Sequence, residues 1–160
     1  MIAKTVLAGL AAGLVAFVAA APTGTDAIGA TCTSGAAASN PSFDIKYVNV
    51  SSVLPAGLSG RNYEPDRTWA AEHALHTTYL GLTAGGGMDA YGAFKCQFAC
   101  NGEQGCLSYF GRYVQIGTSQ EHFDCITYDA LLDSSLFVED SESGNLAVGG
   151  FDKPCDAIKA

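Results

Sequence analysis

The sequence predicts an α+β domain in which one helix packs on a small antiparallel sheet and three disulfides staple the two together. Two observations predict the fold. A helical pattern over residues 90–101 carries Cys96 and Cys100 four residues apart, and two aromatic and β-branched segments follow it. A third observation, an N-terminus built like an export signal ahead of all six cysteines, indicates that the thiols are oxidised.

Residues 1–20 have the composition of an export signal. One cation, Lys4, precedes an apolar run of about 15 residues, which is shorter than the ~20 that a membrane-spanning helix needs. Val18 and Ala20 place small residues at −3 and −1 of a cleavage site after Ala20. We expect a cleaved signal peptide rather than the alternative, an uncleaved anchor helix.

The remaining chain divides into a leader and one domain. Residues 21–42 are small, polar and rich in Gly and Ala, which predicts a flexible leader, and residues 43–160 are long enough for a single core. Without Lys4, seven basic residues face sixteen acidic ones, a net charge of −9. This balance and the lack of a basic run argue against nucleic acid as a partner.

The first part of the domain is predicted to contain a strand, a long loop, one or two helical turns and a second strand. Residues 43–50 alternate apolar and polar side chains, as a half-buried strand does, and Asn49-Val50-Ser51 is a usable glycosylation sequon. Prolines and glycines between residues 55 and 65 predict a long loop. One or two helical turns are expected over residues 69–76, and a strand over residues 77–83.

The central helix follows a turn at Gly85-Gly86-Gly87. Asp89 is expected to be its N-cap, because a carboxylate there accepts unpaired backbone N–H groups. Asn101-Gly102 is expected to supply the left-handed residue that ends it. Strands are then predicted within residues 106–116 and 123–128, and residues 131–138 form a further apolar stretch.

The cysteine spacing restricts the disulfide pairing. Cys96 and Cys100 point in the same direction from one helix face, which disfavours a bond between them and removes three of the fifteen possible connectivities. Cys106 lies close enough to fold back on Cys100, and Cys125, in the next strand, is within reach of Cys96. Spacing alone leaves the other connectivities open.

Helix cysteines four apart, a third at a strand start and a fourth in the following strand resemble the PAN/apple domain. Thr77-Thr-Tyr-Leu-Gly-Leu also resembles the strand before the helix in that family, so the resemblance covers residues 77–128. It implies a helix across an antiparallel sheet and the disulfides Cys96–Cys125, Cys100–Cys106 and Cys32–Cys155. The chain is similar to small secreted fungal proteins with such a module.

The aromatic residues of the two predicted strands suggest a binding surface. Alternation puts Tyr109 and Phe110 on opposite faces of the sheet. One face is a candidate platform for sugar rings or a partner protein, with Tyr109 and Tyr113 as rings and Arg112 and Gln115 as polar contacts. The alternative is that these aromatic side chains belong to the core.

Catalytic and metal chemistry find less support in the sequence. His73 and His76, three residues apart, are a candidate metal pair, but solvated histidines are the expected alternative, and we predict no metal or cofactor. Carboxylates such as Asp129 with Asp133, or Glu139 with Asp140, resemble surface acids. All six cysteines are expected in disulfides, which leaves no thiol nucleophile, and we predict no catalytic residue.

The expected function is therefore a secreted, non-enzymatic recognition module that binds a protein or glycan in the extracellular space or cell wall, with no membrane span after signal cleavage. One alternative is a small secreted hydrolase that uses acidic residues or the His73/His76 region. Another is a structural protein of a cell wall or spore coat.

Overall fold

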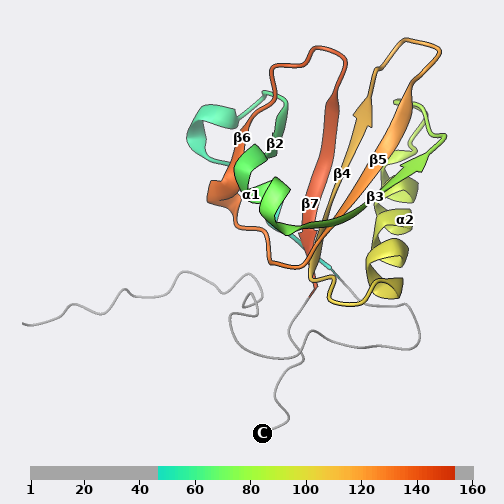
Figure 1. Cartoon of the computed structure of the whole chain (residues 1–160). Coiled ribbons are helices and arrows are strands. Elements are labelled where there is room, and N and C mark those ends of the chain that lie inside the picture. Colours follow the sequence, from blue (N-terminus) through green and yellow to red (C-terminus); the bar gives the residue numbers. More distant parts are fainter. Residues whose placement is uncertain (1–46, 154–160) are drawn as a thin grey trace, which may run out of the picture.

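The computed structural model describes residues 47–153, which form a five-stranded antiparallel sheet, a two-stranded sheet and two α-helices (Figure 1). The predicted α+β class is confirmed. The predicted signal peptide, the leader, residues 43–46, Cys32 and Cys155 lie outside the described residues. Within the described part, neither helix is long and apolar enough to cross a bilayer.

The elements follow one another in an order that interleaves strands with short helices. In chain order they are β1 (Val48–Asn49), η1 (Val50–Ser52), η2 (Ala56–Leu58), β2 (Tyr63–Pro65), α1 (Arg67–His73), β3 (Ala74–Leu80), α2 (Asp89–Gly102), β4 (Ser108–Val114), β5 (His122–Tyr128), η3 (Ser134–Leu136), β6 (Phe137–Glu139) and β7 (Leu146–Asp152).

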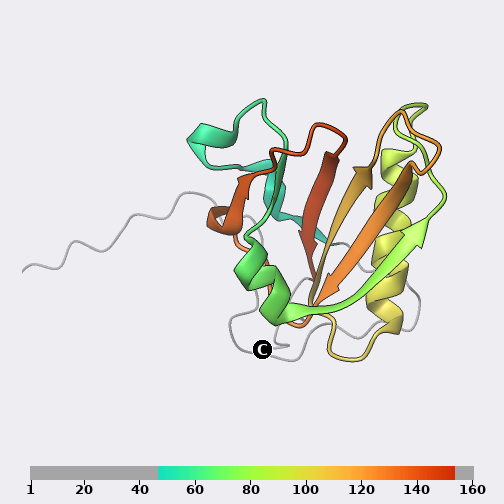
Figure 2. The same cartoon turned by 45° about the horizontal axis from the view of Figure 1, so that its top comes forward.

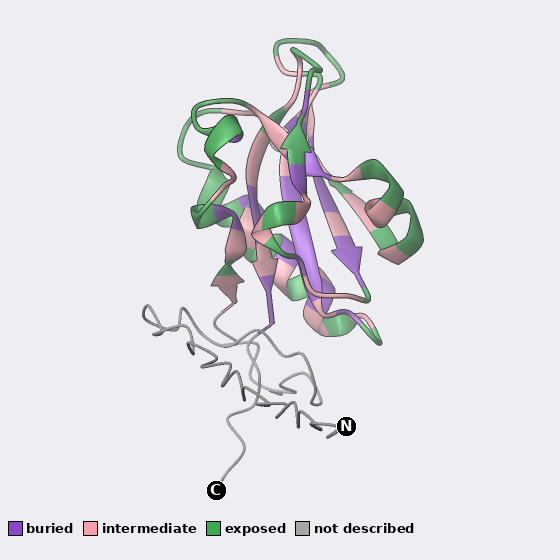
Figure 3. Cartoon of the chain, turned by 90° about the vertical axis from the view of Figure 1, so that its left-hand side faces the viewer, coloured by how far each residue is buried: buried purple, intermediate pink, exposed green. Residues whose placement is uncertain are grey.

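The five-stranded sheet has the order β1-β7-β4-β5-β3, so β4 lies at its centre. Tyr109 of β4 is opposite Thr127 of β5 and Phe151 of β7, and every pairing is antiparallel. Tyr109 and Phe110 belong to two different core clusters, as strand alternation requires. Buried residues concentrate in the strands, while the turns and outer helix surfaces are exposed (Figure 3).

Helix α2 covers one face of this sheet (Figures 1 and 2). Its buried residues are Gly92, Cys96 and Cys100, which are spaced by four and so form one stripe. A Cβ atom at Gly92 would lie 2.7 Å from the ring of Phe123, so glycine is what lets α2 approach β5. This layer buries Tyr109, Tyr113 and Phe123 against the helix cysteines.

The opposite face of the sheet is only partly covered, by α1 and the β2–β6 pair (Figures 1 and 2). The second core cluster forms beneath them from side chains of several elements: Leu58, Phe110, Tyr128, Leu132 and Phe137. Tyr63 packs edge-on against both Phe110 and Phe137, and Trp69 of α1 packs on Tyr128. We call this face, which α2 does not cover, the open face of the sheet.

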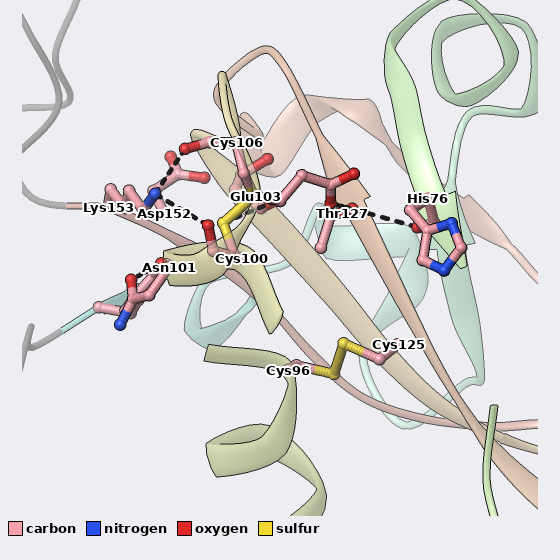
Figure 4. The surroundings of a disulfide bond; sticks show 12 residues. His76, Cys96, Cys100, Asn101, Glu103, Cys106, Cys125, Thr127, Asp152 and Lys153 are labelled. Carbon is pink, nitrogen blue, oxygen red and sulfur yellow. Dashed lines mark hydrogen bonds between the residues drawn. A yellow bond between two sulfur atoms is a disulfide. The ribbon is translucent and has the colours of Figure 1, made fainter. Parts of the chain in front are cut away.

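Two disulfides attach α2 to its surroundings (Figure 4). Cys96 is bonded to Cys125 of β5, and Cys100 is bonded to Cys106, with Cα–Cα distances of 5.3 Å in both. These are the two pairs that the PAN/apple resemblance implies for these four cysteines. The implied third bond, Cys32–Cys155, involves residues outside the described range.

Lys153 closes the C-terminal end of α2. Its Nζ donates hydrogen bonds to the carbonyl oxygens of Cys100, at 3.1 Å, and Cys106, at 2.7 Å (Figure 4). A cation at a helix C-terminus is favourable because the last carbonyls there lack helical partners. Burial lowers the pKa of Lys153. The two carbonyl groups that accept its hydrogen bonds belong to the cysteines of the Cys100–Cys106 disulfide, which holds them in place.

Both expected ends of the central helix need correction. Met88, not Asp89, occupies the N-cap position, and Asp89 accepts a hydrogen bond from the Tyr113 hydroxyl at 3.0 Å. Asn101 and Gly102 both lie inside α2, and the left-handed turn comes later, at Gly105 with φ 84°. The reason is that the chain must turn back to close the Cys100–Cys106 bond.

The first third of the described chain also differs from expectation. The predicted loop over residues 55–65 contains β2, which pairs with β6 far along the sequence. The described part of the predicted strand 43–50 is the short strand β1 followed by η1. Helix α1 ends at His73, and the next residues already belong to β3.

Candidate functional site

The predicted aromatic platform does not exist as proposed. Tyr109 and Tyr113 are 2% and 0% exposed and lie under α2, so they are core residues. Burial raises the pKa of Tyr113 to about 12, and its hydrogen bond to Asp89 adds to this. Gln115 is exposed in the β4–β5 turn, and only Arg112 faces the open side of the sheet. The structure therefore does not bring the four residues together.

Arg112 instead belongs to a row of polar side chains that crosses the open face of the sheet. Its Nη1 lies 3.0 Å from Glu64 Oε2 in β2, and its Nε lies 3.5 Å from Asp124 Oδ2 in β5. The other oxygen of Glu64 accepts a hydrogen bond from Arg67 Nε of α1 at 2.7 Å. We call these residues, with His122 and Tyr79 described next, the polar row.

The far end of the polar row reaches the edge strand β3. His122 Nε2 lies 3.2 Å from Asp124 Oδ1, while His122 Nδ1 lies 2.7 Å from the carbonyl oxygen of Gln120. Because a carbonyl only accepts, Nδ1 carries a proton. The Tyr79 ring meets the His122 ring edge-on at 5.5 Å between centroids and is 70% exposed. Tyr79 thus offers an open aromatic surface beside fixed charged groups.

Burial and charge are balanced along the polar row. The side chains of Glu64 and Asp124 are only 10% and 8% exposed, and each carboxylate lies beside a guanidinium group: Glu64 beside Arg67 and Arg112, and Asp124 beside Arg112. Without such partners, a buried carboxylate would be strongly destabilising. Arg67 is exposed, and its hydrogen bond to Glu64 raises the pKa of its guanidinium further. The row is therefore a set of polar groups already held in place.

A cleft of about 320 Å³ lies beside the polar row, between α1, β2 and the sheet. Its floor contains Phe110, Ile126 and Tyr128, and Glu64, Arg67 and Arg112 form its polar side together with groups from the β6–β7 loop, Glu142 and Asn145. An apolar floor with a few convergent polar groups is the common composition of a ligand site. This cleft is the strongest candidate site in the described chain.

The two histidines considered as a metal pair separate in the structure. His73 Nδ1 lies 2.9 Å from Asp129 Oδ1, whereas His76 lies in β3, where its carbonyl accepts from Thr127 Oγ1 at 3.2 Å (Figure 4). Residues 47–153 hold no group of three His, Cys, Asp or Glu side chains able to bind a metal ion. His73 is thus paired with a carboxylate rather than with His76.

Sequence reasoning found Arg112 and missed its partners. One signal for them is present in the sequence: His122 and Asp124 share a strand face through period-two alternation. Glu64 lies in β2 and Arg67 begins α1, so their spacing of three is not a helical one. The link between Glu64 and Arg112 spans 48 positions and depends on where β2 lies. No local pattern predicts such a contact.

Comparisons with protein-family models, with curated proteins and with solved structures find no match to this chain.

Proposed function

We propose that this chain is an exported, non-enzymatic recognition module of PAN/apple-like type. Its support is the export-signal pattern, a helix packed across an antiparallel sheet, and two disulfides wired as the resemblance implies. A third bond, Cys32–Cys155, joins the ends of the domain in this proposal. The protein works in the extracellular space or the cell wall.

The observation that carries the binding function is the cleft beside the polar row. Its guanidinium groups are oriented by buried carboxylates, so little side-chain entropy is lost when a ligand binds. Glu64 and Asp124 already have arginine partners, which suits them to positioning rather than to acid–base catalysis. These features favour binding over turnover.

The ligand is an extracellular glycan or protein. Arg67 and Arg112 offer N–H donors to hydroxyl or carbonyl oxygens, and the exposed ring of Tyr79 offers a flat surface to a sugar ring or an apolar side chain. Nucleic acid is disfavoured by the net charge, −8 for the whole chain.

The test is a glycan array and a pull-down from extracellular fluid with the secreted protein, followed by affinity measurements on variants. Tyr79→Ala and Arg67→Ala change exposed side chains of the polar row, and each is expected to weaken binding about tenfold or more. Tyr91→Ala, which removes an exposed ring of α2 on the other side of the sheet, is the matched control. Equal losses in all three variants, or none in the first two, contradict the proposal.

A hydrolase is the second candidate, favoured by the His73–Asp129 pair. A carboxylate on Nδ1 orients an imidazole as in catalytic triads, although among the described residues no hydroxyl or thiol bonds to this ring. Ester, peptide and glycoside hydrolysis by the secreted protein should be compared with that of His73→Ala. Activity that His73→Ala abolishes would favour the hydrolase.

A further inference from the structure

Asn49 lies in the edge strand β1 and is exposed. Ser51 Oγ accepts the Gly150 N–H at 3.1 Å and donates its own proton to Asn49 Oδ1 at 2.8 Å. In this arrangement the amide oxygen of Asn49, and not its nitrogen, faces Ser51. Asn49 Nδ2, the atom that would carry an N-linked glycan, makes no hydrogen bond within the described residues.

Ser51, the third residue of the sequon, is buried in the folded domain, and these two hydrogen bonds hold its hydroxyl in place. An enzyme that reads the Asn-Val-Ser sequence must therefore meet it before the domain folds. Glycan transfer to a chain that is still being exported satisfies this condition. The transferring enzyme can thus bind the sequon only in the unfolded chain, and Asn49 stays on the surface after folding.

A shallow pocket of about 280 Å³ adjoins Asn49, which is itself part of the lining. The other lining residues come from η1 and the residue after it, and from the segment that leads into η3; they include Val50, Val53, Leu132, Asp133 and Ser134. Val53 is 59% exposed, so the pocket leaves a large apolar side chain in contact with water. A sugar ring has one largely apolar face and polar edges, which suits this mixture of side chains.

We propose that Asn49 carries an N-linked glycan whose first N-acetylglucosamine seats in this pocket. In the transfer, a bond forms between Asn49 Nδ2 and C1 of the sugar, the bond from C1 to the phosphate oxygen of a lipid diphosphate donor breaks, and Nδ2 loses a proton. The seated sugar shields Val53 and stabilises the folded domain. It also blocks pairing of another chain with the β1 edge of the sheet. This inference rests on the proposed export.

The test uses the full chain expressed in yeast, with peptide mass spectrometry to measure occupancy of Asn49. Three forms are then melted: the glycosylated protein, the same protein trimmed by endoglycosidase H to a single N-acetylglucosamine, and the Asn49→Gln variant. The first two are expected to share one Tm, and Asn49→Gln to melt about 2–5 °C lower. Secreted protein without a glycan, or three equal Tm values, would overturn the proposal.

The variant Val53→Ser separates the seated sugar from a glycan that only extends into solvent. It keeps the sequon and removes an exposed apolar lining residue, so occupancy should be unchanged. In this background, the Tm difference between the single-sugar form and its Asn49→Gln counterpart should shrink at least twofold. An undiminished difference would rule out the pocket. Secreted protein that lacks the glycan but binds its ligand would refute this inference alone; a chain that stays inside the cell would contradict export.

Discussion

Asp152 is a buried acid whose environment opposes its charge. It is 1% exposed, and within residues 47–153 only one of its oxygens has a partner, the backbone N–H of Leu132 at 2.9 Å. Burial raises the pKa of Asp152 from 3.8 to about 7, and the Leu132 hydrogen bond offsets only part of this. The carboxyl group is therefore easier to ionise in the unfolded chain than in the folded one.

The sign of the resulting pH dependence follows from linkage. Between about pH 4 and pH 7 the folded state holds the Asp152 proton and the unfolded state releases it, so this group lowers the free energy of unfolding as pH rises. Asp152→Asn should remove this slope. Relative to its value at pH 4, the advantage of the variant should grow by up to about 4 kcal/mol at pH 8 in urea unfolding. If the free energy of unfolding changed with pH in parallel in the parent protein and in Asp152→Asn, this role of Asp152 would be contradicted.

Gly92 is a second single-residue constraint, set by sterics. A Cβ there would lie 2.7 Å from the ring of Phe123, which is fully buried and has no room to move. Gly92→Ala is expected to destabilise the domain by about 1–3 kcal/mol in thermal or urea unfolding, although alanine favours helices.

Gly102→Ala is the control for Gly92→Ala in the same helix. No atom lies within 4 Å of a Cβ at Gly102, so only the helix propensity changes, and stability should stay equal or rise by up to about 1 kcal/mol. A loss of similar size in both variants would show that the contact with Phe123 is not the cause.

Among the larger elements, Glu121 joins two loops at one end of the sheet. Its carboxylate accepts backbone N–H bonds from Ala84, at 2.6 Å, and Gly117, at 3.0 Å, so it ties the segment before α2 to the β4–β5 turn. These bonds lower the pKa of Glu121. This pair of hydrogen bonds, the Glu121 clamp, is then fully present above the ordinary pKa of the carboxyl group, 4.5. It is lost as pH falls through the lower pKa that Glu121 has in the folded state.

Glu121→Ala should release both loops without unfolding the sheet. Amide hydrogen exchange at Ala84 and Gly117 should become faster than in the parent protein, while exchange in β4 and β5 stays slow. Glu72→Ala, an exposed acid of α1, should leave both amides unchanged. Unaltered exchange at Ala84 in Glu121→Ala would refute the clamp.

The two disulfides differ in how much they constrain the unfolded chain. Cys96–Cys125 closes a loop with a sequence separation of 29, and Cys100–Cys106 one with a separation of 6. Chain entropy assigns them about 3.6 and 2.4 kcal/mol, large amounts beside a typical domain stability of ~5–15 kcal/mol. Cys96→Ser is expected to abolish secretion of folded protein. A normal yield with an unchanged Tm would contradict this.

Local patterns in the sequence predict some elements and not others. The central helix, β4 and β5 are foreseeable, because their aromatic, β-branched and cysteine residues repeat at helical or strand spacing. β2 is not, since it has three residues and pairs with β6 more than seventy positions away. Strand alternation also predicts that Tyr109 and Phe110 lie on opposite faces of the sheet, but it does not predict that α2 covers the face of Tyr109.

Across the molecule as a whole, the two faces of the sheet are covered differently. One carries α2, both described disulfides and the rings of Tyr109, Tyr113 and Phe123, so it serves stability. The other carries the polar row and the cleft. The candidate site was only partly predictable, because Glu64 and Arg67 reach Arg112 through a strand pairing without a local signal.

The face opposite α2 is the one that we expect to bind the extracellular ligand. An NMR titration of the ¹⁵N-labelled protein, with the glycan or protein found by the array or pull-down, locates the binding face residue by residue. We expect the shifted amides to cluster around Tyr79, His122, Arg112 and Arg67, on the side of the cleft. Shifts that cluster instead on the outer surface of α2, around Tyr91 and Phe94, would contradict binding at the cleft.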